Sequence, residues 1–564
     1  MMPCNPPLLS LPGALPAVLQ RIFLALICLS FTSNLLSAAE TGTRDPIRER
    51  VERIRAGDTL TIGTETVASV QVLPALYEQH DYAPVWTRSD SIEQLFAALE
   101  TIDEDGLDAT DYHYEALSAL RSASATGTLD PVSAADYDIL LTDSLVRLGY
   151  HLLVGKVDPV ELDNHWNMDD TIGDLDTALA LAQAIDRGTV DELVERLRPQ
   201  HPAYARLRGA LARYRAIQQR DGWQPVPAGP VLKPGMTDQR VPALRRRLAV
   251  TGDLADASSG STEFDDALTK GVEKFQRRHG LEADGIVGPS TLRALNVPVQ
   301  DRIDQIRVNL ERARWVLHRL PDEYVLTDIA GFRVVYFRNG NLIWQSRAQV
   351  GKPYRKTPVF RSKITYLDIN PTWTVPPTIL NQDILPRLKK DPDYLRKKDM
   401  RVLTFDGKPV DERTIDWSLY PGRKFPYMIR QNPGPQNALG RIKFMFPNQY
   451  AVYLHDTPSK SLFGRTDRAL SSGCIRIENP YEFGVLLLNN PQWDKARILA
   501  VVERGKTTTV RLDHPVTVIL MYWTVDTNSA GDVVFRNDIY QRDAAVLAAL
   551  KRPFHFRKSP VLKP

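Results

Sequence analysis

Apolar residues recur at helical spacing through residues 45–222. In the segment 91–99 they fall at intervals of three and four, and Ser91 is a residue type suited to the N-cap of a helix. The same period predicts further helices at 140–153, 175–185 and 190–197. The acidic stretch 103–108 resembles the start of a calcium loop but lacks the full ligand pattern with its closing Glu, which favours a plain acidic turn. These patterns predict a helical domain that carries no catalytic group.

A Pro/Gly-rich stretch at 224–230 predicts a linker, and a compact unit follows it over residues 231–297. Helices are expected at 241–248, at 264–280 with Gly280 ending it, and at 290–295. The order of certain residues resembles the signature of the peptidoglycan-binding module: Phe275-Gln276, Gly280-Leu281, Asp284-Gly285-x-x-Gly288 and Thr291-Leu292. The alternative interpretation is a generic three-helix bundle.

From Tyr324 the period of apolar residues changes from helical to alternating, which predicts β-strands. The pair Asn339-Gly340 is a strong signal for a hairpin turn. Strands are expected at 324–329, 332–337, 342–346, 441–446, 450–454, 498–502 and 516–523. Between 376 and 430 the alternation breaks among prolines and clustered charges, so we expect an insertion over the sheet. A further helix is expected at 302–317 and a short one at 544–550.

Length and composition add limits to this pattern. The 564 residues are too many for one hydrophobic core, and the net charge of +3 gives no electrostatic argument for nucleic acid. Arg21 precedes an apolar run at 22–31 and a small-residue site at Ala38-Ala39, which predicts a signal peptide over 1–39, with an uncleaved anchor as the alternative. No later run is long enough to span a membrane, so we expect an exported protein without a stable membrane span after cleavage.

Cysteine usage is the most informative part of the composition. The chain has three cysteines, and removal of residues 1–39 would take Cys4 and Cys28 and leave Cys474 alone. In an oxidising compartment a single thiol has no partner within its own chain. It therefore forms an intermolecular link, lies buried and inert, or reacts.

The residues around Cys474 favour a reactive thiol. A thiol attacks as its thiolate and needs a base or cation beside it. His455 ends a predicted strand nineteen positions earlier, far enough for the chain to loop back. Gly473 permits close approach of the backbone, where neighbouring N–H groups can hold an oxyanion. Arg476 can bind a carboxylate or lower the thiol pKa, and Tyr453 would share a strand face with His455.

His455 and the run Ser472-Gly473-Cys474-Ile475-Arg476 together resemble the signature of the L,D-transpeptidase catalytic domain, the YkuD-type fold, in its serine variant at Ser472. The stretches 351–358, 370–376 and 437–440 fit the same family. The order of the regions resembles the large periplasmic L,D-transpeptidases of Gram-negative bacteria, of the YcbB type.

The resemblance implies an α+β multi-domain protein with a mostly-β catalytic domain. Its expected parts are a signal peptide at 1–39, a helical scaffold domain at 45–222, a peptidoglycan-binding-like domain at 231–297, a catalytic domain at 323–505 with a cap at about 376–430, and a strand and helix at 506–564 that complete the scaffold or the catalytic domain.

The resemblance also implies a cysteine acyl transfer. Cys474 would attack the carbonyl that joins the third residue of a tetrapeptide stem, expected to be meso-diaminopimelate, to its terminal D-Ala. The amine of a second stem would resolve the thioester into a 3→3 cross-link. His455 would be the base, oriented by a backbone carbonyl rather than by Asp456. Candidate oxyanion or substrate-binding residues are Gly473, Ser472, Arg476, Tyr453, Asn437 and Trp373.

Three alternatives stay open at this stage. Water as acceptor would make the protein an L,D-carboxypeptidase, a lipoprotein lysine would make it an anchoring enzyme, and an inactive site would leave a cell-wall binding protein. The motifs of penicillin-binding serine enzymes and of His-Glu-x-x-His zinc enzymes are absent from the sequence, and we expect no cofactor or metal. Expected partners are donor and acceptor stems in the periplasm and carbapenem-type inhibitors, with no nucleic acid.

Overall fold

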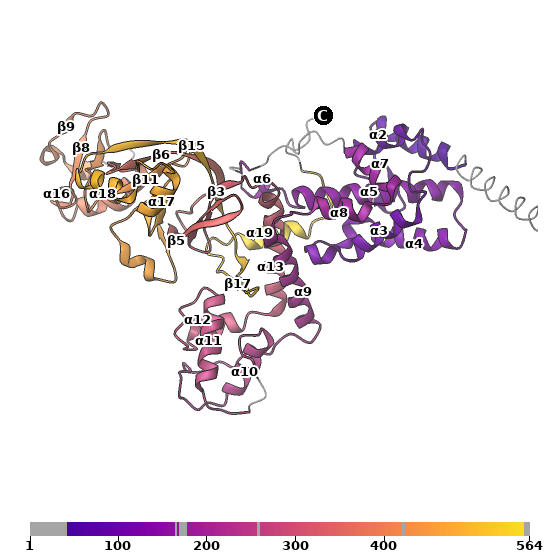
Figure 1. Cartoon of the computed structure of the whole chain (residues 1–564), viewed down its shortest axis with the longest axis horizontal. Helices are drawn as coiled ribbons and strands as arrows, with labels where there is room; N and C mark the ends of the chain where they lie inside the picture. Colours follow the sequence, from indigo (N-terminus) through magenta and orange to yellow (C-terminus); the bar gives the residue numbers. More distant parts are fainter. Residues whose placement is uncertain are drawn as a thin grey trace, which may run out of the picture.

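The computed structural model describes residues 42–163, 166–168, 177–256, 260–419, 424–528 and 530–557. The predicted signal peptide with Cys4 and Cys28 lies outside the described residues, as do positions 175–176 of one expected helix. A helical region occupies one end of the molecule, a sheet region occupies the other, and a smaller unit projects from between them (Figure 1). No helix in the described part of the chain is long and apolar enough to cross a membrane.

The helical region is built around α5 (Pro131–Val154), which is buried along most of its length. Asp130 starts this helix by accepting hydrogen bonds from the Val132 and Ser133 N–H groups at 2.8 and 3.0 Å. The helices around it are α2 (Val72–Gln79), α3 (Ser89–Glu100), α4 (Tyr114–Ala125), α6 (Pro159–Leu162), α7 (Thr177–Arg187), α8 (Val190–Leu197) and α9 (Pro202–Gln218).

The expected N-cap at Ser91 is wrong. Helix α3 begins two residues earlier, and Arg88 occupies the cap position without a side-chain cap. Ser91 is buried inside the helix, and its hydroxyl donates to the Ile185 carbonyl of α7 at 2.7 Å. A serine hydroxyl can cap its own helix or donate to a free carbonyl at the end of a neighbouring helix. Only tertiary contacts decide which of the two it does.

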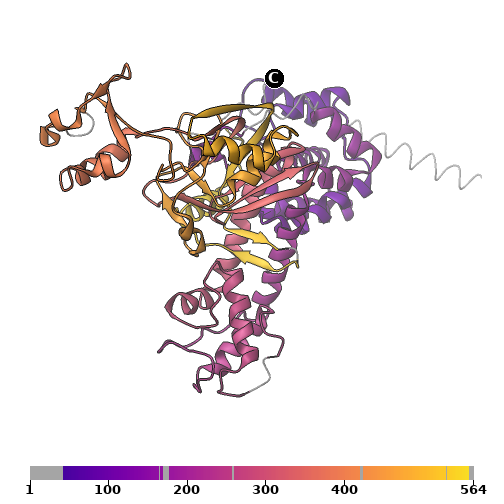
Figure 2. The same ribbon diagram turned by 60° about the vertical axis from the view of Figure 1, so that its left-hand side comes forward.

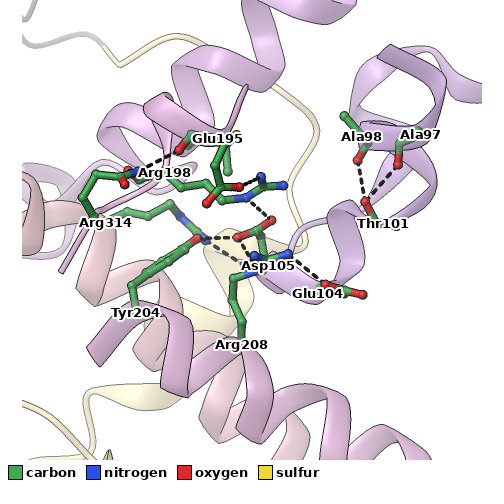
Figure 3. Close-up of polar contacts among 12 residues, drawn as sticks. Ala97, Ala98, Thr101, Glu104, Asp105, Glu195, Arg198, Tyr204, Arg208 and Arg314 are labelled. Atoms are coloured by element: carbon green, nitrogen blue, oxygen red, sulfur yellow. Dashed lines mark hydrogen bonds and ion pairs between the residues drawn. The ribbon is translucent and has the colours of Figure 1, made fainter. Parts of the chain in front are cut away.

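The acidic turn at 102–105, η1 (Ile102–Asp105), ties the helical region to the rest of the chain (Figure 3). The Asp105 carboxylate is completely buried. It accepts from Arg198 Nε at 3.0 Å and from the Tyr204 hydroxyl at 2.9 Å, and Arg208 Nε lies 3.2 Å away. Arg314 of α13 (Val299–Val316) donates to the Asp105 carbonyl at 2.8 Å. The turn therefore forms a buried ionic junction at Asp105, while Asp103 and Glu104 remain exposed.

Replacing Asp105 with Asn should destabilise the helical region by about 3–5 kcal/mol, because the change removes a completely buried anion and leaves Arg198 and Arg208 only their more exposed partners, Glu195 and Glu104. Urea unfolding followed by helical circular dichroism measures this. The matched control is Asp103→Asn in the same turn, where the side chain is 57% exposed and pairs with Arg215. We expect the control to cost less than about 1 kcal/mol. Equal unfolding midpoints for the two variants would contradict a structural role for Asp105.

Residues 231–297, called the module below, fold around one small apolar core. Within the described residues its helices are α10 (Val241–Val250), α11 (Asp266–Arg278) and α12 (Pro289–Leu295), close to the expected positions. Gly280 follows α11 with φ +63°, the left-handed conformation that ends a helix. Val226 of the predicted linker is also buried in this core, so the linker is packed against the module.

The sheet region closes on itself. Among the described residues nine strands follow the order β13-β5-β14-β12-β11-β6-β15-β3-β4, and β4 pairs with β5 as well. The strands are β3 (Glu323–Asp328), β4 (Arg333–Arg338), β5 (Asn341–Gly351), β6 (Phe360–Ile369), β11 (Ile442–Met445), β12 (Leu454–His455), β13 (Ala469–Ser471), β14 (Ile475–Ile477) and β15 (Thr508–Met521). Asn339 and Gly340, both at positive φ, turn β4 into β5 as expected.

Two strand expectations were wrong. Residues 498–502 lie in helix α18 (Lys495–Glu503), which Asp494 caps and whose buried residues Ile498, Val501 and Val502 follow helical spacing. A short apolar run fits either structure, and the cap decides here. The strand expected at 450–454 is reduced to β12, because Ala451 has φ +53° and the Asn448 side chain binds both the N–H and the carbonyl of Val452.

The insertion at 376–430 forms its own small body beside the sheet region, where it projects to one side (Figure 2). Among the described residues its small sheet has the strand order β7 (Trp373–Thr374), β10 (Met428–Gln431), β8 (Met400–Leu403) and β9 (Pro409–Val410), of which β7 lies just before the insertion. Short helical segments accompany them: α14 (Pro377–Ile379), the π-helical turn η4 (Leu380–Ile384), α15 (Leu385–Leu388) and α16 (Tyr394–Lys397). Its apolar core is separate from that of the sheet.

The C-terminal part of the chain returns to both large regions. Strand β15 pairs with β6 on one side and, in parallel, with β3 on the other. Strands β16 (Val525–Thr527) and β17 (Val533–Phe535) then pack against α9 and α11, and α19 (Asp543–Leu550) packs against α13. Helix α17 (Pro480–Leu488) covers the sheet, where Phe483 stacks on Trp344 at 4.6 Å.

Candidate active site

Cys474 lies in a tight turn between β13 and β14. Gly473 has φ +120°, a conformation that residues with a side chain rarely adopt. The Ser471 hydroxyl donates to the Cys474 carbonyl at 2.6 Å and accepts from the Gly473 N–H at 3.1 Å. Since this N–H is already bound, Gly473 holds the turn in shape and has no donor left for an oxyanion.

The register of three neighbouring strands gathers the site residues on one face of the sheet. Strands β12 and β14 are parallel, with His455 opposite Arg476. Strand β11 runs antiparallel to β12, with Lys443 opposite His455. Residues paired in register point to the same face, so Lys443, His455 and Arg476 share one side. Tyr453 lies two positions before His455 and Cys474 lies two positions before Arg476, so both are on the same side.

The thiol of Cys474 lies among groups of β12 and the loop before it. Its Sγ is 3.7 Å from the Ala451 carbonyl, and both the N–H and the hydroxyl of Tyr453 lie within hydrogen-bonding reach. Burial raises the pKa of the Cys474 thiol, against the opposing effects of the Tyr453 N–H and of the Arg476 and Lys443 charges. The resting nucleophile is therefore a neutral thiol.

His455 is buried, with 3% of its surface exposed, and is held by backbone carbonyls. Its Nδ1 bonds to the Asp456 carbonyl, and the Leu439 carbonyl is also close. Burial, together with the Arg476 charge, lowers the pKa of His455 to about 3, so the ring is a neutral base at neutral pH. The Asp456 carboxylate turns away to the Arg441 N–H at 2.8 Å and to Lys460.

The structure brings His455 and Cys474 to adjacent strands without joining them. Among the described residues no hydrogen bond links the imidazole to the thiol, and Tyr453 lies beside both groups. The rings of Tyr453 and His455 meet edge to face at 5.7 Å. Catalytic hydrogen bonds are often long in ligand-free sites, so this separation leaves a base role open.

The other expected site residues divide into two groups. Trp373 lies within hydrogen-bonding reach of the Tyr453 hydroxyl. Arg476 is held by the Gln349 side chain at 3.1 Å, and burial lowers its pKa. Asn437 lies away from the thiol: its amide donates to the carbonyls of Pro371 and Asn432 and accepts from the Leu439 N–H. Asn437 thus shapes the loop whose Leu439 carbonyl approaches His455.

Ser472 is exposed and joins the nucleophile turn to the insertion. Its hydroxyl accepts from Arg355 Nη1 at 2.7 Å, and the same guanidinium binds Asp383 at 2.6 Å and Gln382 at 2.6 Å in η4. Arg355 belongs to the stretch 351–358 that fits the family signature, but nothing in its sequence context indicates these partners. The contact fixes the edge of the insertion beside Cys474.

Thr357 and Tyr540 support the nucleophile turn from behind. Thr357 belongs to the stretch 351–358 that fits the family, but its role was not expected, and nothing in the sequence pointed to Tyr540. The Thr357 hydroxyl donates to the Gly473 carbonyl at 2.8 Å and accepts from the Gly351 N–H at 2.9 Å. The Tyr540 hydroxyl donates to the Gly351 carbonyl at 2.6 Å and accepts from the Thr357 N–H at 3.1 Å. A residue close to the C-terminus therefore positions the loop that holds the turn.

Alkylation of Cys474 by iodoacetamide should be slow at neutral pH and rise about tenfold per pH unit from pH 6 to 9. The raised pKa keeps the thiol protonated at neutral pH, and only the thiolate reacts. Mass spectrometry at a series of pH values gives the rate, and Cys474→Ser is the unlabelled control. A rate that is already constant between pH 6 and 8 would mean a resting thiolate and contradict the prediction.

Comparison with known proteins assigns the regions of the chain. Residues 322–509 match the family described as "L,D-transpeptidase catalytic domain", residues 237–295 match "Putative peptidoglycan binding domain", and residues 71–211 match "Scaffold domain". A curated relative, "Putative L,D-transpeptidase" of Haemophilus influenzae, is 37% identical over 246 residues, which is 43% of this chain and 48% of the relative. The match thus spans about half the length of that relative.

Solved structures give weaker likenesses. The L,D-transpeptidase of Stackebrandtia nassauensis is 14% identical and covers 53% of this chain and 97% of its own, with a TM-score of 0.21. The L,D-transpeptidase LdtMt1 in complex with imipenem is 12% identical and covers 36% of this chain and 59% of its own, with a TM-score of 0.16. Scores this low carry no weight for the residues of the site.

Proposed function

We propose that this chain, whose residues 322–509 are an L,D-transpeptidase catalytic domain preceded by a peptidoglycan-binding domain, forms 3→3 cross-links between peptidoglycan stems through a thioester on Cys474. One observation carries the proposal. The register of β11, β12 and β14 sets a thiol, a neutral imidazole and a tyrosine hydroxyl on one face of the sheet within that domain.

In the first half of the proposed reaction, Cys474 Sγ bonds to the carbonyl carbon that precedes the terminal D-Ala, and His455 takes the thiol proton. The ring is unprotonated at neutral pH, because burial lowers its pKa to about 3, so its free nitrogen is available to receive the proton. The Tyr453 hydroxyl and the N–H of Cys474 are our candidates for holding the oxyanion. The amide C–N bond then breaks, and His455 returns the proton to the departing D-Ala amine.

In the second half, the side-chain amine of an acceptor stem attacks the thioester carbonyl. His455 takes a proton from this amine, a new amide bond forms, and the C–S bond breaks. The proton returns to the sulfur, so the enzyme is restored and no cofactor takes part. Donor and acceptor are both tetrapeptide stems, with diaminopimelate at the third position.

The setting of this chemistry is also part of the proposal. A peptidoglycan substrate and the predicted signal peptide both support action in the periplasm of a Gram-negative cell. Carbapenems are expected to acylate the same thiol, because their strained amide carbonyl offers Cys474 the same kind of target. The module would hold the enzyme on the wall through glycan or stem contacts.

Intact-mass spectrometry of the mature protein with purified disaccharide-tetrapeptide tests the proposal. We expect a thioester adduct, release of D-Ala and a dimeric 3→3 product. An adduct that yields tripeptide without dimer would mean that the protein is an L,D-carboxypeptidase and does not form cross-links. An adduct that resolves only onto a lipoprotein lysine would make the protein an anchoring enzyme. A folded protein with a free thiol, no adduct and no D-Ala release would be a cell-wall binding protein.

A further inference from the structure

Two basic side chains lie beside the thiol of Cys474, and neither is held in a close ion pair within the described residues. Among the described residues, Lys443 and Arg476 form no ion pair, and Arg476 is bound only by the neutral Gln349 side chain. Asp368, the register partner of Lys443 on β6, raises the pKa of Lys443 through its charge, and its carboxylate accepts from the Thr509 hydroxyl at 2.6 Å. Both cations raise the positive potential at the nucleophile.

The position of Lys443 is set by the sheet. Its neighbours Ile442 and Phe444 are completely buried in the main core, so Lys443 points to the opposite face, which is the face of His455. The ammonium group lies 4.1 Å from the centroid of the Tyr453 ring, a cation–π contact that holds it beside the Tyr453 hydroxyl and the thiol. Lys443 is thus a fixed part of the site floor.

One carboxylate, that of Asp368 on β6, faces these cations, and neither the thiol nor the imidazole adds a negative charge. The thiol is neutral at rest because its pKa is raised, and the imidazole is neutral because its pKa is lowered. Burial lowers the pKa values of Lys443 and Arg476, which reflects the energetic cost of holding both charges there. An unpaired, partly desolvated cation gains most from a ligand that brings an anion.

We propose that Lys443 selects the acyl donor by binding a carboxylate that lies next to the scissile amide. This inference rests on the proposed function, and it assigns Lys443 as a specificity-determining residue. The carboxylate belongs either to the departing D-amino acid or to the side chain of the third stem residue. Both sources offer the same chemistry, and the Tyr453 ring fixes the ammonium close to either position.

Lys443→Met tests the assignment, because methionine keeps an unbranched side chain and removes the charge. With the natural tetrapeptide donor we expect kcat/KM for D-Ala release to fall about 10–100-fold, the usual effect of losing a charged hydrogen bond. Lys443→Arg should recover most of this loss. Lys363→Met, at an exposed lysine on β6, is the matched control and should leave kcat/KM unchanged.

Donor analogues identify the carboxylate. One analogue carries the terminal D-amino acid as its amide, and the other carries an amidated side-chain carboxylate on the third residue. On the analogue that lacks the relevant carboxylate, wild type and Lys443→Met should have kcat/KM values within about threefold of each other. On the other analogue the full difference between the two proteins should remain.

Two results would overturn the inference without touching the proposed function. In the first, wild type turns over every donor and the kcat/KM of Lys443→Met is lower by the same factor on all of them. In the second, Lys443→Met has the kcat/KM of wild type on every donor. The first pattern would mean that Lys443 supports the site or transfers a proton, and the second that it has no role in donor selection. Failure of wild type to form a thioester with any donor would instead refute the proposed function. Wild-type thermal unfolding and circular dichroism of Lys443→Met verify that its fold is intact.

Discussion

Cys474→Ala is expected to abolish acyl transfer, with D-Ala release at least about 10⁴-fold below wild type. Cys474 is the only thiol in the part of the chain that the structure describes, and Cys4 and Cys28 belong to the predicted signal peptide. Without the sulfur no thioester can form, and the neighbouring hydroxyls of Ser471 and Ser472 are already bonded to the Cys474 carbonyl and to Arg355. Release of D-Ala from purified tetrapeptide donor measures the loss.

Cys474→Ser gives a second version of this test. It keeps a nucleophile of similar size, but the hydroxyl is far less acidic, so we expect a similar loss of turnover. Both variants should unfold at the wild-type temperature and still bind isolated peptidoglycan if the module does so. Substantial D-Ala release by Cys474→Ala would exclude a covalent mechanism on this residue.

The second large effect is expected for His455→Gln, with donor acylation at pH 7 about 10²–10⁴-fold slower than in wild type. Glutamine can fill part of the space of the ring and bond to a backbone carbonyl, but it accepts no proton. Because the pKa of His455 is about 3, wild type should keep its acylation rate from pH 8 down to pH 5. The variant depends on thiolate, so its residual rate should rise about tenfold per pH unit up to the raised pKa of the thiol.

Quenched-flow mass spectrometry of the acyl-enzyme at each pH measures both profiles. His514→Gln is the matched control, because this histidine is exposed on β15. If His455→Gln follows the flat wild-type profile with only a small loss of rate, another group is the base. Lys443 would then be the first candidate, since burial lowers its pKa and it faces the same site.

The sequence allowed prediction of those parts of the site that lie close together in the chain. The run from Ser472 to Arg476 and the strand end at His455 were visible because their spacing and residue types are local. Lys443 and Tyr540 were not, since their roles depend on which strands become neighbours and in what register. Lys443 resembles any lysine of an alternating strand until β11 is placed beside β12.

The fold was predictable to a similar extent. Helix α13 and the hairpin at Asn339-Gly340 have strong local signals and were confirmed, whereas the helix expected at 140–153 covers only the second part of α5, which begins at Pro131. Short apolar runs led to wrong predictions. A strand was expected at 498–502, but these residues lie in helix α18, whose N-terminus is capped by Asp494. The junction around Asp105 was also missed, because an acidic turn has the same composition whether water or buried arginines surround it.

Strand β15 has a consequence for the order in which the protein can fold. It completes the closed sheet by pairing in parallel with β3, from which it is separated by about 190 residues of chain. Contacts at such long sequence separation make folding slow, whereas the helical region and the module rely on nearer neighbours and can form early. The sheet with its nucleophile turn is therefore the last part to assemble. A nascent or exported chain would leave β3 and β6 as open, aggregation-prone edges until β15 arrives, so this interval is where holding chaperones would act.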